Sequence, residues 1–113
     1  MADDDYCYLT TTGRRSGRPH RIEIWYAAED TTLYLLAGGG RSADWVQNLI
    51  VDPTVLVELD NTEQPARARV LADGDDAQRA RALVYAKYAP RSGNDLSGWR
   101  DRALPVALDL TTP

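Results

Sequence analysis

Turn-forming residues interrupt this sequence at short intervals, and their spacing constrains the fold more than any other feature. Stretches rich in β-branched, aromatic and aliphatic residues run for only five to nine residues before glycine, proline or a polar run ends them. Because short turns join most successive stretches, we expect an antiparallel sheet. The pattern predicts six strands, at residues 6–12, 20–28, 33–37, 54–59, 65–72 and 105–110.

Two other segments carry the apolar spacing of a helix. The first begins at Ser42, a favourable N-cap residue, and ends near residue 51, just before a proline. The second covers residues 74–88, and residues 99–103 predict only a short turn. We therefore expect a mainly β, α+β fold, a small barrel of about six antiparallel strands with two helices, as one domain over residues 1–113.

The scarcity of reactive side chains narrows the chemistry. Cys7 and His20 are the only cysteine and the only histidine, so one chain cannot form a disulfide, a catalytic triad or a cysteine-rich metal site. We predict no metal, and an enzyme of this composition needs a cofactor to carry the reaction. The N-terminal residues are acidic, and no apolar run reaches the roughly 18 residues that span a bilayer. We expect a cytoplasmic protein without membrane insertion.

The charge is unevenly distributed. The chain has a net charge of −4, yet residues 6–22 contain four arginines and no acidic residue. One compact basic turn in an acidic chain favours a local anion site over nucleic-acid binding, although a solvated turn is an alternative. Arginine binds phosphate and carboxylate in a bidentate way, and glycine lets backbone N–H groups approach an anion. The candidates at this turn are Gly13, Arg14, Arg15, Ser16, Arg18 and Pro19.

A run of three glycines precedes the first predicted helix. Residues 38–40 lead through Arg41 into the helix, an arrangement in which unpaired N–H groups favour an anion and a flat ring can lie against the backbone. A flexible connection is the alternative. Trp45 and Asn48 lie one helical turn apart and share a face. Core packing would explain Trp45, whereas a buried Asn48 amide would need hydrogen-bond partners.

Taken together, these segments resemble the deazaflavin (F420)-dependent nitroreductase, or F420H2-dependent quinone reductase, family. Residues 9–19, LTTTGRRSGRP, are similar to the opening signature of that family. The glycine run and the residues from Trp45 to Val55 match a second signature, and residues 102–106 resemble the start of the last strand. The resemblance implies the split β-barrel fold of FMN-binding flavin reductases. It also implies coenzyme F420, an 8-hydroxy-5-deazaflavin with a phosphate and an oligoglutamate tail.

The resemblance assigns roles to particular residues. Hairpin arginines would hold the phosphate and tail carboxylates, the glycine run would lie along the ring or phospholactate, and the first helix would border the same groove. The implied cofactor-binding set is Gly13, Arg14, Arg15, Ser16, Arg18, Pro19, Ala37, Gly38, Gly39, Gly40, Arg41, Trp45, Asn48 and Leu49. Tyr88 is the candidate catalytic residue, as a proton donor to the acceptor; packing of its ring on the barrel is the alternative.

The implied activity is hydride transfer from reduced F420 to a small-molecule electron acceptor: a quinone, a nitro compound or another conjugated molecule. We expect a homodimer, because a barrel of this size has few helices to cover its apolar strands. Two alternatives remain open at this point. The chain could be an FMN- or haem-binding split barrel, since a basic groove accepts any phosphorylated or carboxylated planar cofactor. It could also be a non-catalytic deazaflavin carrier.

Overall fold

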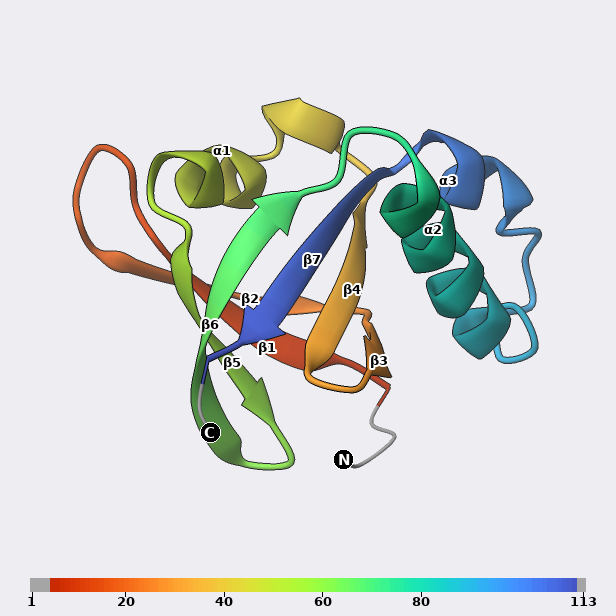
Figure 1. Cartoon of the computed structure of the whole chain (residues 1–113), viewed down its shortest axis with the longest axis horizontal. Helices are drawn as coiled ribbons and strands as arrows, with labels where there is room; N and C mark the ends of the chain where they lie inside the picture. Colours follow the sequence, from red (N-terminus) through yellow and green to blue (C-terminus); the bar gives the residue numbers. More distant parts are fainter. Residues whose placement is uncertain (1–4, 112–113) are drawn as a thin grey trace.

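The computed structural model describes residues 5–111, in which a seven-stranded antiparallel sheet curls around an apolar core (Figure 1). Its order is β2-β1-β5-β6-β7-β4-β3. The strands are β1 (Cys7–Thr12), β2 (Pro19–Ile24), β3 (Ala27–Glu29), β4 (Thr32–Ala37), β5 (Thr54–Leu59), β6 (Thr62–Val70) and β7 (Leu104–Leu110). The helices are the 3-10 helix η1 (Gly40–Ser42), α1 (Asp44–Val51), α2 (Asp75–Tyr88) and α3 (Ser97–Arg102).

Tight turns set the register of two antiparallel strand pairs, β5–β6 and β3–β4. Asp60 and Asn61 join β5 to β6 with φ values of 51° and 61°, the left-handed backbone that two-residue hairpins require. Asp30, with φ of 55°, has the same role between β3 and β4. Aspartate and asparagine tolerate this conformation better than other residues with a side chain. The sequence therefore places polar turn residues where the backbone needs them.

Alternation along the strands separates the barrel interior from the outside. Cys7, Leu9 and Thr11 of β1 are buried, while the residues between them are only half-buried. Leu9 lies opposite Ile22 of β2 and Val57 of β5, and all three side chains belong to the same core. Register and hydrophobic pattern therefore agree, as expected where one face of a sheet is buried.

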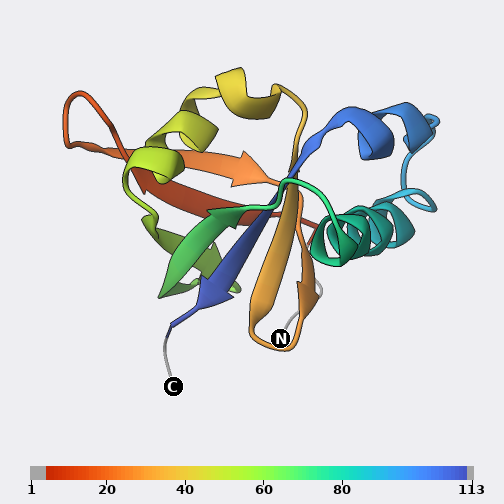
Figure 2. The ribbon, with the colours of Figure 1, turned by 45° about the horizontal axis from the view of Figure 1, so that its top comes forward.

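The strands β4 and β7 are buried on both faces. In β4, Leu33 and Leu35 face the barrel core, whereas Tyr34 and Leu36 belong to a second cluster with Val84 of α2. The flank of the sheet formed by β7, β4 and β3 is covered by α2, while α1 lies over another part of the same sheet (Figures 1 and 2). Burial on both faces explains why these two strands read as nearly continuous apolar runs.

The prediction of a mainly β, α+β split barrel is confirmed, with corrections to its elements. The strand expected at residues 20–28 breaks at Trp25, because the backbone N–H and carbonyl of Tyr26 bond to the side chains of Tyr88 and Lys87 instead of continuing the β1–β2 pairing. Seven strands result instead of six. A third helix, α3, replaces the expected turn at 99–103, and Ser42 lies in η1, so that Ala43 caps α1.

Within residues 5–111, none of the helices has both the length and the apolar character needed to cross a bilayer.

Candidate functional site

The buried amide of Asn48 connects the β1–β2 turn to α1. Asn48 is 4% exposed. Its Oδ1 accepts hydrogen bonds from the backbone N–H of Arg14 at 3.1 Å and from Arg14 Nη1 at 2.9 Å, and its Nδ2 donates to Thr11 Oγ1 at 3.2 Å. Both polar atoms of the buried amide therefore have a hydrogen-bond partner. These bonds hold the basic hairpin against the helix, beside which its loop lies in both ribbon views (Figures 1 and 2).

The tip of this hairpin has its own hydrogen bonds. The Gly13 N–H donates to the Arg18 carbonyl at 2.8 Å, and the Gly17 N–H donates to the Gly13 carbonyl at 2.9 Å. The Arg18 N–H donates to Ser16 Oγ at 3.1 Å. Gly17 has φ of +73°, a conformation in which a side chain would be strained. The tip is thus a defined turn that presents Arg15 and Arg18 outward, both of them exposed.

The three arginines of the tip are not equivalent. The Arg14 side chain is only 20% exposed, and its Nη2 forms an ion pair with Asp44 Oδ1 at 3.3 Å. Within residues 5–111, the side chains of Arg15 and Arg18 have no ion pair or hydrogen bond. A hollow of about 280 Å³ lies here, lined by Gly13, Arg14, Arg15, Ser16, His20, Asp44 and Asn48. Arg14 therefore shapes this hollow, while Arg15 and Arg18 carry cationic charge available to an anion.

The glycine run leads from β4 into η1 and lies between the start of α1 and Trp99 of α3. A Cβ at Gly39 would lie 3.3 Å from Ala43 Cβ, and a Cβ at Gly38 would lie 3.6 Å from Trp99 Nε1. Gly40 has φ of +62°, and Ser42 Oγ donates to the Gly39 carbonyl at 2.8 Å. Gly38, Gly39 and Arg41 are exposed. The run therefore presents bare backbone between the N-terminal end of α1 and an indole edge.

Three aromatic rings form a cluster in which Trp99 adjoins Gly38. Trp25 lies parallel to Tyr88, with ring centroids 4.3 Å apart, and meets Trp99 edge to face at 5.7 Å. Trp25 remains 39% exposed although Tyr88 is buried. Offset and edge-to-face contacts of this kind stabilise the rings that make them. The cluster thus offers a rigid, partly open aromatic surface. The sequence did not predict that Trp25 and Trp99 would form it.

The hydroxyl of Tyr88 is occupied within the fold. It accepts from the Tyr26 N–H at 3.0 Å and lies within hydrogen-bond distance of the carbonyls of Tyr26 and Asp5, at 3.0 and 2.5 Å. Burial raises the pKa of Tyr88 from 10.0 to about 12, so the phenol stays protonated at neutral pH. This geometry favours the packing role, and a catalytic role for Tyr88 stays a prediction.

The remaining predicted site residues are partly structural. Leu49 is buried in the barrel core, and Trp45 is half-buried against the same core. Ala37 is buried and pairs with Leu104 of β7, whereas Pro19 is exposed at the start of β2. Thr11 and Asp44 position Asn48 and Arg14, and no motif in the sequence marks them for that role. Pairing across 30 or more residues leaves no local signal in a sequence.

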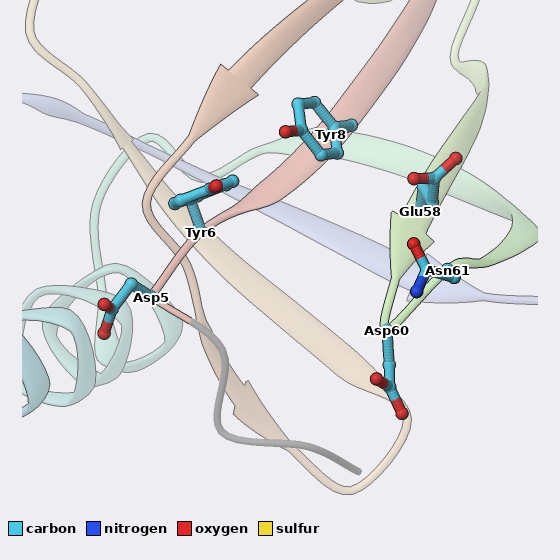
Figure 3. A pocket seen from close by; sticks show the side chains of 6 residues that line it. All are labelled: Asp5, Tyr6, Tyr8, Glu58, Asp60 and Asn61. Atoms are coloured by element: carbon cyan, nitrogen blue, oxygen red, sulfur yellow. The ribbon is translucent and has the colours of Figure 1, made fainter.

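A second hollow lies at the opposite end of β1 from the hairpin tip (Figure 3), and its lining residue Asp5 also borders Trp25 and Tyr88. Its lining residues are Asp5, Tyr6, Tyr8, Glu58, Asp60 and Asn61. The Arg21 guanidinium lies 4.2 Å from the Tyr8 ring centroid and pairs with Glu58 at 3.1 Å. This ion pair neutralises part of the negative charge of the hollow. Over the part of the chain that the structure describes, no group of three or more potential ligands is placed to hold a metal ion.

The curled sheet, the basic hairpin and the glycine run define a split barrel of the flavin-reductase type. A family model for F420H(2)-dependent quinone reductases matches residues 1–111. The chain belongs to this family, which identifies it as an F420H2-dependent oxidoreductase, and the resemblance inferred from its motifs is confirmed.

Solved structures agree with this assignment of the fold. An F420-H2 dependent reductase, FDR-A, is 24% identical with a TM-score of 0.76, covering 96% of this chain and 97% of its own. A protein described as a domain-swapped dimer is 25% identical with a TM-score of 0.75, covering 96% and 82%. The heme storage protein HutZ from Vibrio cholerae is 17% identical with a TM-score of 0.71, covering 98% and 84%. The same barrel thus occurs in proteins that handle different planar cofactors.

Proposed function

We propose that this protein transfers a hydride from reduced F420 to a planar conjugated acceptor, a quinone or a nitroaromatic compound. The observation that carries the proposal is the open aromatic surface of Trp25, stacked on Tyr88 and adjoining Trp99, next to the bare backbone of Gly38. An acceptor ring that stacks on an indole is held parallel to it, and parallel rings bring their reacting carbons close.

The residues present fit F420 by their chemistry. Two side chains at the hairpin tip, Arg15 and Arg18, are exposed cations suited to a phosphate and carboxylate tail. Gly38 and Gly39 are exposed, so a flat ring system can approach their backbone from solvent. We propose that Arg41, exposed in η1, also faces the phosphate portion.

When bound, reduced F420 supplies the hydride, and the side chains supply position and electrostatics. In the proposal, Asn48 fixes the position of the hairpin through Arg14. The anion-binding side chains of the hairpin therefore keep a constant position relative to the glycine run. Trp25 orients the acceptor and excludes water from one of its faces. No protein group need change its protonation state for hydride transfer itself, which suits a chain with a single histidine.

Stopped-flow mixing of the F420H2-loaded protein with menadione tests the proposal. We expect oxidised coenzyme to reappear faster than without protein, and faster for menadione than for bulky or saturated acceptors. Oxidation no faster than the uncatalysed rate, for menadione and a panel of nitroaromatics alike, would favour a coenzyme carrier. FMN binding at least as tight as F420 binding would contradict the cofactor assignment.

A matched pair of variants tests the aromatic surface. Trp25→Ala should lower kcat/KM for menadione by about two- to tenfold while leaving F420 affinity within about twofold, since stacking with aromatic rings contributes roughly 0.5–1.5 kcal/mol beyond the buried area. Tyr85→Ala is the control, because Tyr85 is an aromatic residue of α2 that packs against Arg100, 4.4 Å from its ring centroid, in a hollow that does not include Trp25. Equal losses for both variants would contradict the proposed acceptor position.

We propose further that the protein acts as a homodimer. Leu56 is exposed on β5, and Ile50 and Val51 are exposed at the end of α1, so apolar surface remains uncovered in one chain. The relative described as a domain-swapped dimer supports the same assembly. Sedimentation equilibrium at tens of micromolar should give twice the mass of one chain, and the mass of a single chain would refute the dimer.

A further inference from the structure

The imidazole of His20 is part of the hollow at the hairpin tip. His20 is exposed on β2, opposite Thr11 of β1. A Cβ at Gly13 would lie 2.6 Å from His20 Nε2 and 2.7 Å from Ser16 Oγ, so the ring covers the backbone of Gly13 with the serine hydroxyl beside it. Absence of a side chain at Gly13 thus allows the imidazole to occupy this position.

The charge of this hollow is small when His20 is neutral. Arg14 and Arg15 contribute two positive charges, and Asp44 from α1 contributes one negative charge at 3.3 Å from Arg14. The other lining residues, Gly13, Ser16 and Asn48, carry no charge. The net charge is therefore +1, and protonation of His20 makes it +2. Arg18 at the same tip adds a further positive charge whichever form His20 takes.

We propose that His20 is a pH-dependent ligand of the anionic portion of the coenzyme, binding it most tightly as imidazolium. The inference rests on the proposed function, because it takes the coenzyme anion to occupy the hollow at the hairpin tip. Neutral imidazole offers one N–H donor and one acceptor, whereas imidazolium offers two donors and a charge. Histidine gains that charge between about pH 8 and pH 5. Affinity for the coenzyme therefore rises as pH falls through this interval.

Calorimetric titration with F420 at pH 5.5 and 8.0 tests the inference on wild-type protein, His20→Gln and His20→Arg. Wild type should gain about five- to tenfold in affinity at the lower pH relative to His20→Gln, the order expected for one charge-assisted contact at an exposed site. His20→Arg should bind tightly at both values. Ionisation of the coenzyme itself is the same in all three titrations, so the ratio between proteins isolates His20.

A second measurement needs no variant. Because His20 is the only histidine, untagged protein gives one set of imidazole NMR signals. Saturation with F420 should raise the midpoint of that titration by about 0.7–1 pH unit, which is the same five- to tenfold preference expressed as linkage. An unchanged midpoint, or a wild-type to His20→Gln ratio that is constant with pH, would overturn the role of His20 alone. Failure of wild type to bind F420 at either pH would overturn the proposed function.

Discussion

Replacement of Asn48 by alanine tests the contact that joins the hairpin to α1. The substitution removes three hydrogen bonds: those to the Arg14 N–H, to Arg14 Nη1 and to Thr11 Oγ1. A neutral hydrogen bond contributes about 0.5–1.5 kcal/mol net and one to a charged group about 1.5–3 kcal/mol. Arg14 is partly exposed and can recover bonds to water. We therefore expect Asn48→Ala to lower the free energy of unfolding by about 2–4 kcal/mol.

The same substitution should loosen the hairpin and weaken F420 binding. Urea denaturation monitored by tryptophan fluorescence measures the first effect, and coenzyme titration of the folded variant measures the second. Gln47→Ala is the control, since the half-buried neighbour makes only a 3.3 Å bond to the Ser42 carbonyl, and its loss should cost under about 1 kcal/mol. Asn48→Asp keeps the shape and the acceptor for Arg14 but adds a negative charge to the hollow, so it should bind F420 more weakly than wild type.

An unfolding free-energy loss below about 1 kcal/mol in Asn48→Ala, or one no greater than in Gln47→Ala, would contradict this contribution of the amide. Either result would mean that the hairpin holds its position without the amide. Unchanged coenzyme affinity in a clearly destabilised variant would show that Asn48 stabilises the fold without positioning the anion-binding groups.

Three other substitutions give independent expectations. Tyr88→Phe should cost about 1–2 kcal/mol of stability through its lost bonds to Tyr26, and menadione turnover that survives it, measured by stopped flow, removes Tyr88 from the chemistry. Burial raises the pKa of Cys7 from 9.0 to about 12, so the stability from the buried thiol is complete below pH 9 and is lost as pH rises toward 12. Between pH 8 and 11, wild type should lose about 2–3 kcal/mol more unfolding free energy than Cys7→Ala, and equal losses would contradict this. Gly38→Ala should leave the melting temperature nearly unchanged, because its Cβ would lie 3.6 Å from Trp99, yet should weaken F420 binding in a fluorescence titration by placing a methyl group over the glycine run.

Much of the fold could be predicted because it depends on local patterns. The strands β1 and β5 follow from alternating burial and from the polar residues that end them, and α2 follows from apolar residues at helical spacing. The glycine run and the basic turn were visible as motifs, and their order along the chain was enough to indicate the family. These features are encoded by residues close together in sequence, so a single sequence reveals them.

Only the tertiary structure distinguished the three arginines of the hairpin tip. In the sequence, Arg14, Arg15 and Arg18 are equivalent cations in one turn. In the fold, Asp44 and Asn48, 30 and 34 residues away, lie beside Arg14 and convert it into a positioning residue. The break at Trp25 has the same origin, since the groups that bond to Tyr26 come from α2, 61 and 62 residues further along. Periodicity reports which face of a strand or helix is buried, but not which distant side chain it meets there, because that depends on how the sheet curls and where the helices pack.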